Sequence, residues 1–199
     1  MNTIAIDVET TGLGHMTRTP REDAVLQVGI AWRENGKVRT WSDYCNPGKE
    51  YFSNGRADEA LRINCISYET IQNAEPAKTV AKKFWNQVKE IEESLGQTGE
   101  FRAYNRAFDQ GFLESRPWKI PAHKWGGCIM QAAASYLIDG DRLGLQRAMQ
   151  MLEIPWPGKS AHDAASDAHA ALLVHEKISG QPVRSERKIS AAEKTRTGG

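Results

Sequence analysis

The stretch IAIDVETTGL near the start of the chain limits the possible folds and functions more than any other segment. An apolar strand pattern runs into two carboxylates, Asp7 and Glu9, and then breaks at Thr-Thr-Gly. Residues two apart in a strand point to the same face, so both carboxylates project together at the carboxyl end of this strand. They repel each other unless a cation lies between them, and hard divalent cations prefer such oxygen ligands. An acidic pair that faces water at a sheet edge is the alternative, and this stretch alone leaves both open.

The apolar pattern of the whole chain predicts an α/β fold. Strands are expected at 2–8, 24–33 and 37–44, and Asn35-Gly36 is a strong hairpin signal, so these strands form an antiparallel three-strand meander. Helical and strand patterns then alternate, which favours a mixed five-stranded sheet, the meander plus parallel strands, flanked by helices. We expect further strands at 101–104 and near 125–129, and helices at about 57–62, 67–72, 78–95, 107–115, up to 138, 143–152 and 161–179.

A second group of candidate residues follows the strand expected at 101–104. Asn105 directly follows that strand and can cap the next helix, and Asp109 lies four residues further on. If this strand lies beside the first one, Asp109 comes close to Asp7 and Glu9. An acid in a first helical turn is also favoured by the helix dipole alone, so a purely structural role for Asp109 stays open.

A third group opens the last, alanine-rich helix. His162 lies at or near the start of this helix, and Asp167 lies well inside it. An aspartate among small inward-facing alanines is costly to bury unless it meets a cation. Asp163, in contrast, is expected to be a first-turn acid that faces solvent.

Composition and charge describe an ordinary globular domain with a tail. Of the 199 residues, 26% are charged and the net charge is +1. We expect one domain over 1–180 and a basic, disordered tail over 181–199, which could hold nucleic acid or a partner through charge. The three cysteines, Cys45, Cys65 and Cys128, fit neither a disulfide framework nor a zinc site, so a reducing, cytoplasmic location is expected. No signal peptide pattern or membrane-spanning run is present.

Taken together, three motifs resemble those of the DEDDh 3′–5′ exonucleases, the family of polymerase proofreading subunits and RNase T. They are Asp7-x-Glu9 after a strand, Asn105-x-x-Phe108-Asp109, and His162-x-Ala164-x-x-Asp167. Each motif alone is weak, but their order and context together are specific, and the resemblance covers roughly residues 1–178. The segment before the central helix is also similar, although many members have a histidine where this chain has Asn64.

The resemblance implies an RNase H-like fold in which four acids hold two Mg²⁺ ions, with Mn²⁺ able to substitute. Asp7 would bridge the two ions. Glu9 and Asp167 would lie on one side, and Asp109 on the other through water. His162 matches the general base that takes a proton from the attacking water; a structural or capping histidine is the alternative.

The resemblance also implies a substrate-binding role for several uncharged residues. Gly12 allows close approach of a nucleotide, Thr10 can offer a hydroxyl or an amide to the terminal sugar, and Leu13 resembles a residue that wedges against the last base. Asn105 and Phe108 complete this set. For Leu13 and Phe108, covering or filling the core is the alternative.

The implied function is hydrolysis of phosphodiester bonds at single-stranded 3′ ends by a metal-dependent 3′–5′ exonuclease that releases nucleoside 5′-monophosphates. DNA is favoured over RNA by family analogy, and a polymerase or a replication or repair protein is a possible partner. The alternatives are an exoribonuclease of the same fold and a non-catalytic polymerase-accessory module that binds nucleic acid. No membrane association is expected.

Overall fold

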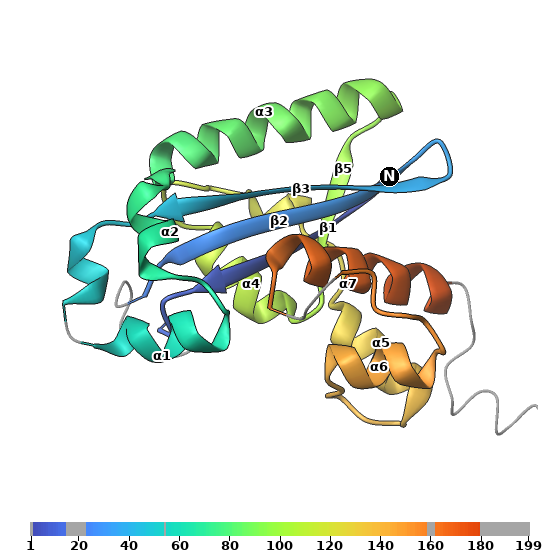
Figure 1. Ribbon diagram of the computed structural model, residues 1–199. Coiled ribbons are helices and arrows are strands. Elements are labelled where there is room, and N and C mark those ends of the chain that lie inside the picture. Colours follow the sequence, from blue (N-terminus) through green and yellow to red (C-terminus); the bar gives the residue numbers. More distant parts are fainter. Residues whose placement is uncertain (1, 15–22, 54, 159–161, 180–199) are drawn as a thin grey trace, which may run out of the picture.

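The computed structural model describes residues 2–14, 23–53, 55–158 and 162–179, which form a mixed sheet covered by helices on both faces (Figure 1). The strands are β1 Asn2–Thr10, β2 Val25–Glu34, β3 Lys37–Asn46, β4 Glu75–Pro76 and β5 Gly99–Ala103. The helices are η1 Lys49–Phe52, α1 Arg56–Ile63, α2 Tyr68–Asn73, α3 Ala77–Leu95, α4 Arg106–Leu113, η2 Ala122–Lys124, α5 Ile129–Leu137, α6 Leu145–Met151 and α7 Ala164–Ile178.

The sheet has the order β4-β3-β2-β1-β5. Strands β1, β2 and β3 form the expected antiparallel meander, while β5 pairs parallel to β1 and β4 parallel to β3. The predicted fold class, a mixed five-stranded α/β sheet flanked by helices, is therefore confirmed. In the β1–β2 register Asp7 lies opposite Gly29, and Glu9 lies opposite Gln27.

One predicted strand is wrong. At 125–129 the chain makes only an isolated parallel bridge between Trp125 and Phe101. Two glycines, Gly126 and Gly127, follow Trp125, and α5 already begins at Ile129, so no length remains for a ladder. The fifth strand is instead the two-residue β4, which pairs with the end of β3.

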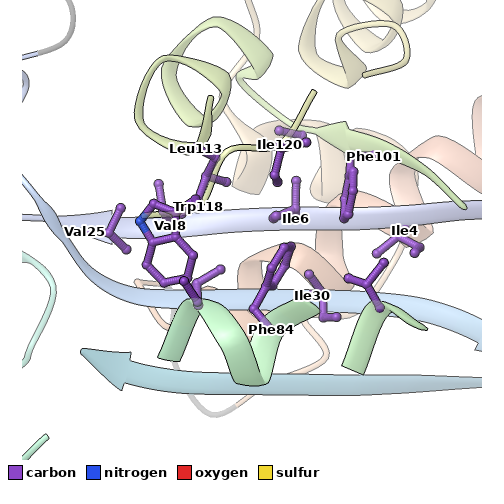
Figure 2. Close-up of a cluster of buried hydrophobic side chains, with 14 of the residues drawn as sticks. Ile4, Ile6, Val8, Val25, Ile30, Phe84, Phe101, Leu113, Trp118 and Ile120 are labelled. Carbon is purple, nitrogen blue, oxygen red and sulfur yellow. The ribbon is translucent and has the colours of Figure 1, made fainter. Parts of the chain in front are cut away.

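The face of the sheet that α3 covers carries the main apolar core (Figure 2). Phe84 of α3 packs against Phe101 of β5, with 5.8 Å between ring centroids. Alternate residues of β1 point to this face, which leaves Asp7 and Glu9 on the other one. The buried β1 and β2 side chains of this core are Ile4, Ile6, Val8, Val25, Val28, Ile30 and Trp32.

The opposite face is covered by α7, which approaches the sheet closely because the side chains between them are small. Ala5 and Ala31 of the sheet meet Ala168 and Leu172 of α7. At Gly29 the approach is closest, since a Cβ there would lie 2.2 Å from the carbonyl carbon of Ala164. The first turn of α7 therefore rests directly on β2, at the residue that pairs with Asp7.

Further helices pack against α7 or against one end of the sheet. Helices α5 and α6 form a second apolar cluster with α7, and α1 and α2 cover the site-proximal end of β2 and β3 (Figure 1). The predicted tail, 181–199, lies outside the described residues. Among the described residues, no helix is long and apolar enough to cross a membrane.

Candidate active site

Two carboxylates of the site come from β1, as the sequence predicts. Asp7 is half-buried and Glu9 is only 7% exposed, and both point toward the face that α7 covers. The strand presents them beside the first turn of α7 because Gly29, opposite Asp7, leaves room for that turn.

Asp109 of α4 joins them from beyond β5. It is 2% exposed, and its Oδ1 accepts a hydrogen bond of 3.1 Å from the backbone N–H of Val8, between the two β1 carboxylates. Asn105 is the N-cap residue of α4, as predicted, but its side chain makes no capping hydrogen bond. The backbone carbonyl of Asn105 instead accepts from the N–H groups of Phe108 and Asp109, at 2.8 and 3.4 Å.

The start of α7 supplies the last two predicted residues. Ligand atoms of Glu9, His162 and Asp167 all lie within 4.8 Å of one another. His162 is exposed and has a positive φ of 64°, a conformation that is uncommon outside glycine. The structure thus brings together the five residues that the three motifs contribute.

Burial and mutual charge repulsion raise the pKa values of the carboxyl groups in the cluster. Burial, followed by the charges of Asp109, Glu9 and Asp167, raises the pKa of Asp7 well above its ordinary value. Burial and the charges of Asp167 and Asp109 raise the pKa of Glu9 to about 8. The pKa of Asp109 is raised to about 8 by burial, against the lowering effect of the Val8 N–H. A cation in the cluster would remove this repulsion.

Asp167 shows most directly that a cation fits. Burial raises its pKa to about 6, while a backbone hydrogen bond from His162 and the charge of that imidazole lower it. Its Oδ1 is buried and has no hydrogen-bond partner among the described residues. A buried carboxylate oxygen without a donor is costly, and a divalent cation with oxygen ligands satisfies it. The residues that would hold the metal are Asp7, Glu9, Asp109 and Asp167, with His162 within reach.

The loop after β1, predicted to hold the substrate, is fixed by internal hydrogen bonds. The hydroxyl of Thr10 donates to the carbonyl of Gly12 over 2.7 Å. Leu13 is 66% exposed, so it does not cover the core, and its apolar side chain is available for a ligand. Asn64 of the α1–α2 connection donates from Nδ2 to the Thr10 carbonyl over 3.3 Å, which links this loop to the α1 end of the molecule.

The other two predicted substrate residues belong to the start of α4. Asn105 is half-buried, and its side chain makes no capping bond to α4. Phe108 lies 5.3 Å from the Phe112 ring between centroids and packs against the main core, which agrees with the alternative interpretation given above.

Several residues that shape the site were missed by sequence reasoning. Asp163 is the N-cap of α7 rather than a solvent-facing acid, because its carboxylate accepts from Ser166 and from Gln27. Gln27 is the single polar residue in the apolar run 25–32, which is a signal the sequence did contain. Asp23 was missed as well: it accepts from the hydroxyl of Thr11, and this bond helps to close the loop after β1.

Comparison with known proteins identifies the family of the chain. A sequence profile described as exonuclease, of the RNase T type, matches residues 4–175. Ribonuclease T of Actinobacillus pleuropneumoniae serotype 5b (strain L20) is 27% identical over 172 residues, which cover 82% of this chain and 77% of that protein.

Solved structures show the same fold at lower identity. The nuclease domain of 3′hExo, a DEDDh family member bound to rAMP, is 18% identical with a TM-score of 0.67, covering 92% of this chain and 94% of that one. The cell-death related nuclease 4 (CRN-4) is 16% identical with a TM-score of 0.64, covering 92% of this chain. The chain spans 65% of the length of CRN-4. With the profile covering most of the chain and the motifs in place, the chain belongs to the exonuclease family and, within it, to the DEDDh 3′–5′ exonucleases.

Proposed function

We propose that the protein is a metal-dependent 3′–5′ exonuclease that hydrolyses phosphodiester bonds at single-stranded 3′ ends and releases nucleoside 5′-monophosphates. The observation that carries this proposal is the convergence of four carboxylates and one histidine, with a buried Asp167 oxygen that has no partner among the described residues. Asp7, Glu9, Asp109 and Asp167 would hold two Mg²⁺ ions, with Mn²⁺ able to replace them, and the bound metal would supply electrostatic stabilisation of the attacking and leaving oxygens.

His162 is the group that accepts the proton of the attacking water. Its imidazole is exposed and lies beside Glu9 and Asp167, so a ring nitrogen can reach a water molecule at the edge of the acidic cluster. Imidazole is a side-chain group suited to proton transfer near neutral pH. The same position also allows His162 to bind metal, and the experiment below separates the two roles.

The 3′ end of the substrate is proposed to rest on the loop Thr10–Leu13. Leu13 offers an exposed apolar side chain for the terminal base, and the loop is held in place by Asn64 and Asp23. Since the hydroxyl of Thr10 donates to the Gly12 carbonyl, it can contact the sugar only as a hydrogen-bond acceptor. Asn105 and Phe108 are proposed to border the substrate on the α4 side.

Two polymers, DNA and RNA, are candidates for the substrate. DNA is the first, on the family resemblance. RNA is the second, because one relative is named a ribonuclease and another solved structure is described as 3′-end recognition of a histone mRNA stem-loop by a 3′-exonuclease. A polymerase or a replication or repair protein is the proposed class of partner, and cytoplasm the proposed location.

Matched DNA and RNA oligonucleotides test this proposal. Each is labelled at its 5′ end, so that 3′ shortening leaves a ladder, and digested with Mg²⁺, with Mn²⁺ or with chelator. We expect stepwise shortening with either metal, none with chelator, and faster digestion of DNA. Faster digestion of RNA would select the exoribonuclease. No digestion of either polymer, with metal binding retained in calorimetry, would select the non-catalytic accessory module.

Three variants test the assigned roles. Asp7→Ala and Asp167→Ala should abolish hydrolysis and weaken metal binding while the protein still folds. His162→Ala should strongly lower turnover and retain metal binding. If His162→Ala instead lost metal binding, His162 would be a ligand rather than the base.

A further inference from the structure

Gln27 is a buried polar side chain in the middle of a hydrophobic strand. It is 2% exposed and belongs to β2, between the apolar neighbours Leu26 and Val28. Both polar atoms of its amide are hydrogen-bonded: Nε2 donates to Oδ2 of Asp163 over 2.9 Å, and Oε1 accepts from the backbone N–H of Ala164 over 3.2 Å. One strand side chain therefore binds both the N-cap residue and the first residue of α7.

Asp163 has hydrogen-bond partners on two different elements, β2 and α7. While Oδ2 accepts from Gln27, Oδ1 accepts from the N–H and the hydroxyl of Ser166, each over 3.0 Å. Partial burial acts in the opposite direction, but these hydrogen bonds lower the pKa of Asp163, which keeps it a carboxylate. Asp163 thus caps the helix and joins it to β2 at the same time.

The residues on either side of this junction are the ones that carry the proposed chemistry. His162 directly precedes Asp163 and has the left-handed φ of 64°, and its backbone N–H binds the Asp167 carboxylate. Such a conformation persists in a residue other than glycine only where its surroundings fix it. The position of the imidazole and that of the Asp167 carboxylate therefore depend on where Asp163 is held.

The strand register connects the junction to the other half of the site. Gln27 lies directly opposite Glu9 in the β1–β2 ladder, and Gly29 lies opposite Asp7 while touching the first turn of α7. A shift of α7 relative to β2 would therefore change the separation of Asp167 and His162 from Glu9.

We propose that Gln27 is a positioning residue of the active site, which sets His162 and Asp167 against Glu9 through its paired hydrogen bonds to Asp163 and Ala164. The inference rests on the function proposed above. The alternative is that Gln27 is only a hydrogen-bonded amide in the core. We favour the positioning role because the two hydrogen bonds of Gln27 hold the end of α7 that carries the site. The Arg33–Glu176 ion pair also joins β2 to α7, but at the far end of the helix.

A hydrogen-bond swap tests this role. Gln27→Glu places a carboxylate against the Asp163 carboxylate, and Asp163→Asn places an amide NH₂ against the Gln27 NH₂. The double variant Gln27→Glu/Asp163→Asn restores a donor and an acceptor in reversed order, and both the Ala164 and the Ser166 N–H groups keep an acceptor. Arg33→Gln is the matched control, since it removes a β2–α7 contact away from the site.

Steady-state kinetics, Mn²⁺ titration calorimetry and thermal unfolding are measured on all five proteins, the wild type included. Each single variant should lose about tenfold or more in both kcat and Mn²⁺ affinity, with a nearly unchanged KM for the oligonucleotide. The double variant should return to within about threefold of the wild type, a coupling expected only of directly paired groups. Arg33→Gln should keep wild-type kcat and Mn²⁺ affinity.

Two results would overturn the inference: single variants with wild-type kcat and Mn²⁺ affinity, or a double variant no better than the worse single one. If a single variant does not fold, the kcat and Mn²⁺ affinity of the double variant are compared with those of the wild type and of Arg33→Gln. Recovery of folding and activity in the double variant would still show that positions 27 and 163 are directly paired. A wild type that binds Mn²⁺ but digests neither DNA nor RNA would refute the proposed function alone, and the calorimetry would still judge Gln27. A wild type that binds no Mn²⁺ would refute both.

Discussion

The backbone N–H of Val8 donates a 3.1 Å hydrogen bond to the carboxylate of Asp109, although the two residues are 101 positions apart in the chain. The parallel pairing of β1 with β5 ends at Ile6 and Ala103, and the Asp109 carboxylate takes a place beyond the end of that ladder. The strand that carries Asp7 and Glu9 therefore also fixes the third carboxylate. This bond stabilises the charged form of Asp109, while burial acts against it.

Asp109→Asn should separate catalysis from stability. The amide oxygen can still accept from Val8, so the fold is retained, but the variant loses the negative charge that holds metal. We expect hydrolysis to fall about 100-fold or more, since a metal contributes several kcal/mol of transition-state stabilisation. Glu114→Gln, at the exposed end of the same helix, is the control and should keep full activity. An Asp109→Asn enzyme that retained wild-type turnover would remove Asp109 from the site.

Metal-free stability should fall as the pH rises from about 4 to about 8. Free carboxyl groups titrate near pH 4, whereas the pKa values of Glu9 and Asp109 are raised to about 8 in the folded protein, chiefly by burial. In this window the folded protein binds more protons than the unfolded chain, and by linkage the free energy of unfolding then decreases with pH. The unfolding temperature in chelator should be lower at pH 8.5 than at pH 6.

Two comparisons isolate the acidic cluster in this measurement. Burial lowers the pKa values of His169 and His175, so these histidines make the free energy of unfolding increase with pH near pH 6. Their contribution is the same in the wild type and in a Glu9→Gln variant, so it cancels when the two proteins are compared. That variant should show a weaker loss of stability toward high pH than the wild type. Mn²⁺ should raise the unfolding temperature more at pH 8.5 than at pH 6, because protons compete with the metal. Equal pH profiles for wild type and Glu9→Gln would contradict the charge repulsion inferred here.

Gly29→Ala should push α7 away from the sheet. The added Cβ would lie 2.2 Å from the Ala164 carbonyl carbon, and backbone atoms on a packed helix cannot yield without a shift of the helix. Overpacking of this kind typically costs about 1–3 kcal/mol of unfolding free energy, and Mn²⁺ affinity should fall with it because Asp167 moves. Gly144→Ala is the control, since nothing lies within 4 Å of its added Cβ and its φ is −65°. Urea unfolding and calorimetry measure both effects.

Asn64→Ala should loosen the loop that holds the 3′ end. It removes the Asn64 donor to the Thr10 carbonyl, and the loss of such a hydrogen bond costs about 1 kcal/mol of unfolding free energy. We expect the KM for oligonucleotides to rise more than kcat falls. Asn64→His, which retains a ring donor, should recover part of the loss, and Asn73→Ala at the exposed end of α2 should have no effect. If Asn64→Ala left KM unchanged, Asn64 would have no role in the loop.

Local patterns predicted most of the fold, and the errors arose where partners distant in sequence decided the outcome. The meander followed from the alternation of apolar residues and from Asn35-Gly36, both short-range signals. The strand expected near 125–129 failed because Gly126 and Gly127 end the pairing after a single bridge. The two-residue β4 carries no periodic signal at all and exists only because β3 lies beside it.

The candidate site divides in the same way. The sequence by itself determined which residues can carry the chemistry, since Asp7, Glu9, Asp109, His162 and Asp167 are recognised by residue type, order and short-range context. Residue identity and spacing of two along a strand also determine that Asp7 and Glu9 share a face.

Only the tertiary structure decided how these groups are held. Gln27 had no predicted role and Asp163 was expected to face solvent, yet the fold brings Nε2 of Gln27 within 2.9 Å of Oδ2 of Asp163, across 136 positions. The opening stretch IDVE is thus sufficient to predict one strand and its two carboxylates, but not the arrangement of the whole site. The physical reason is that hydrogen bonds and charge repulsion depend on distances between atoms, and for residues far apart in the chain those distances are set by strand register and by the docking of α4 and α7.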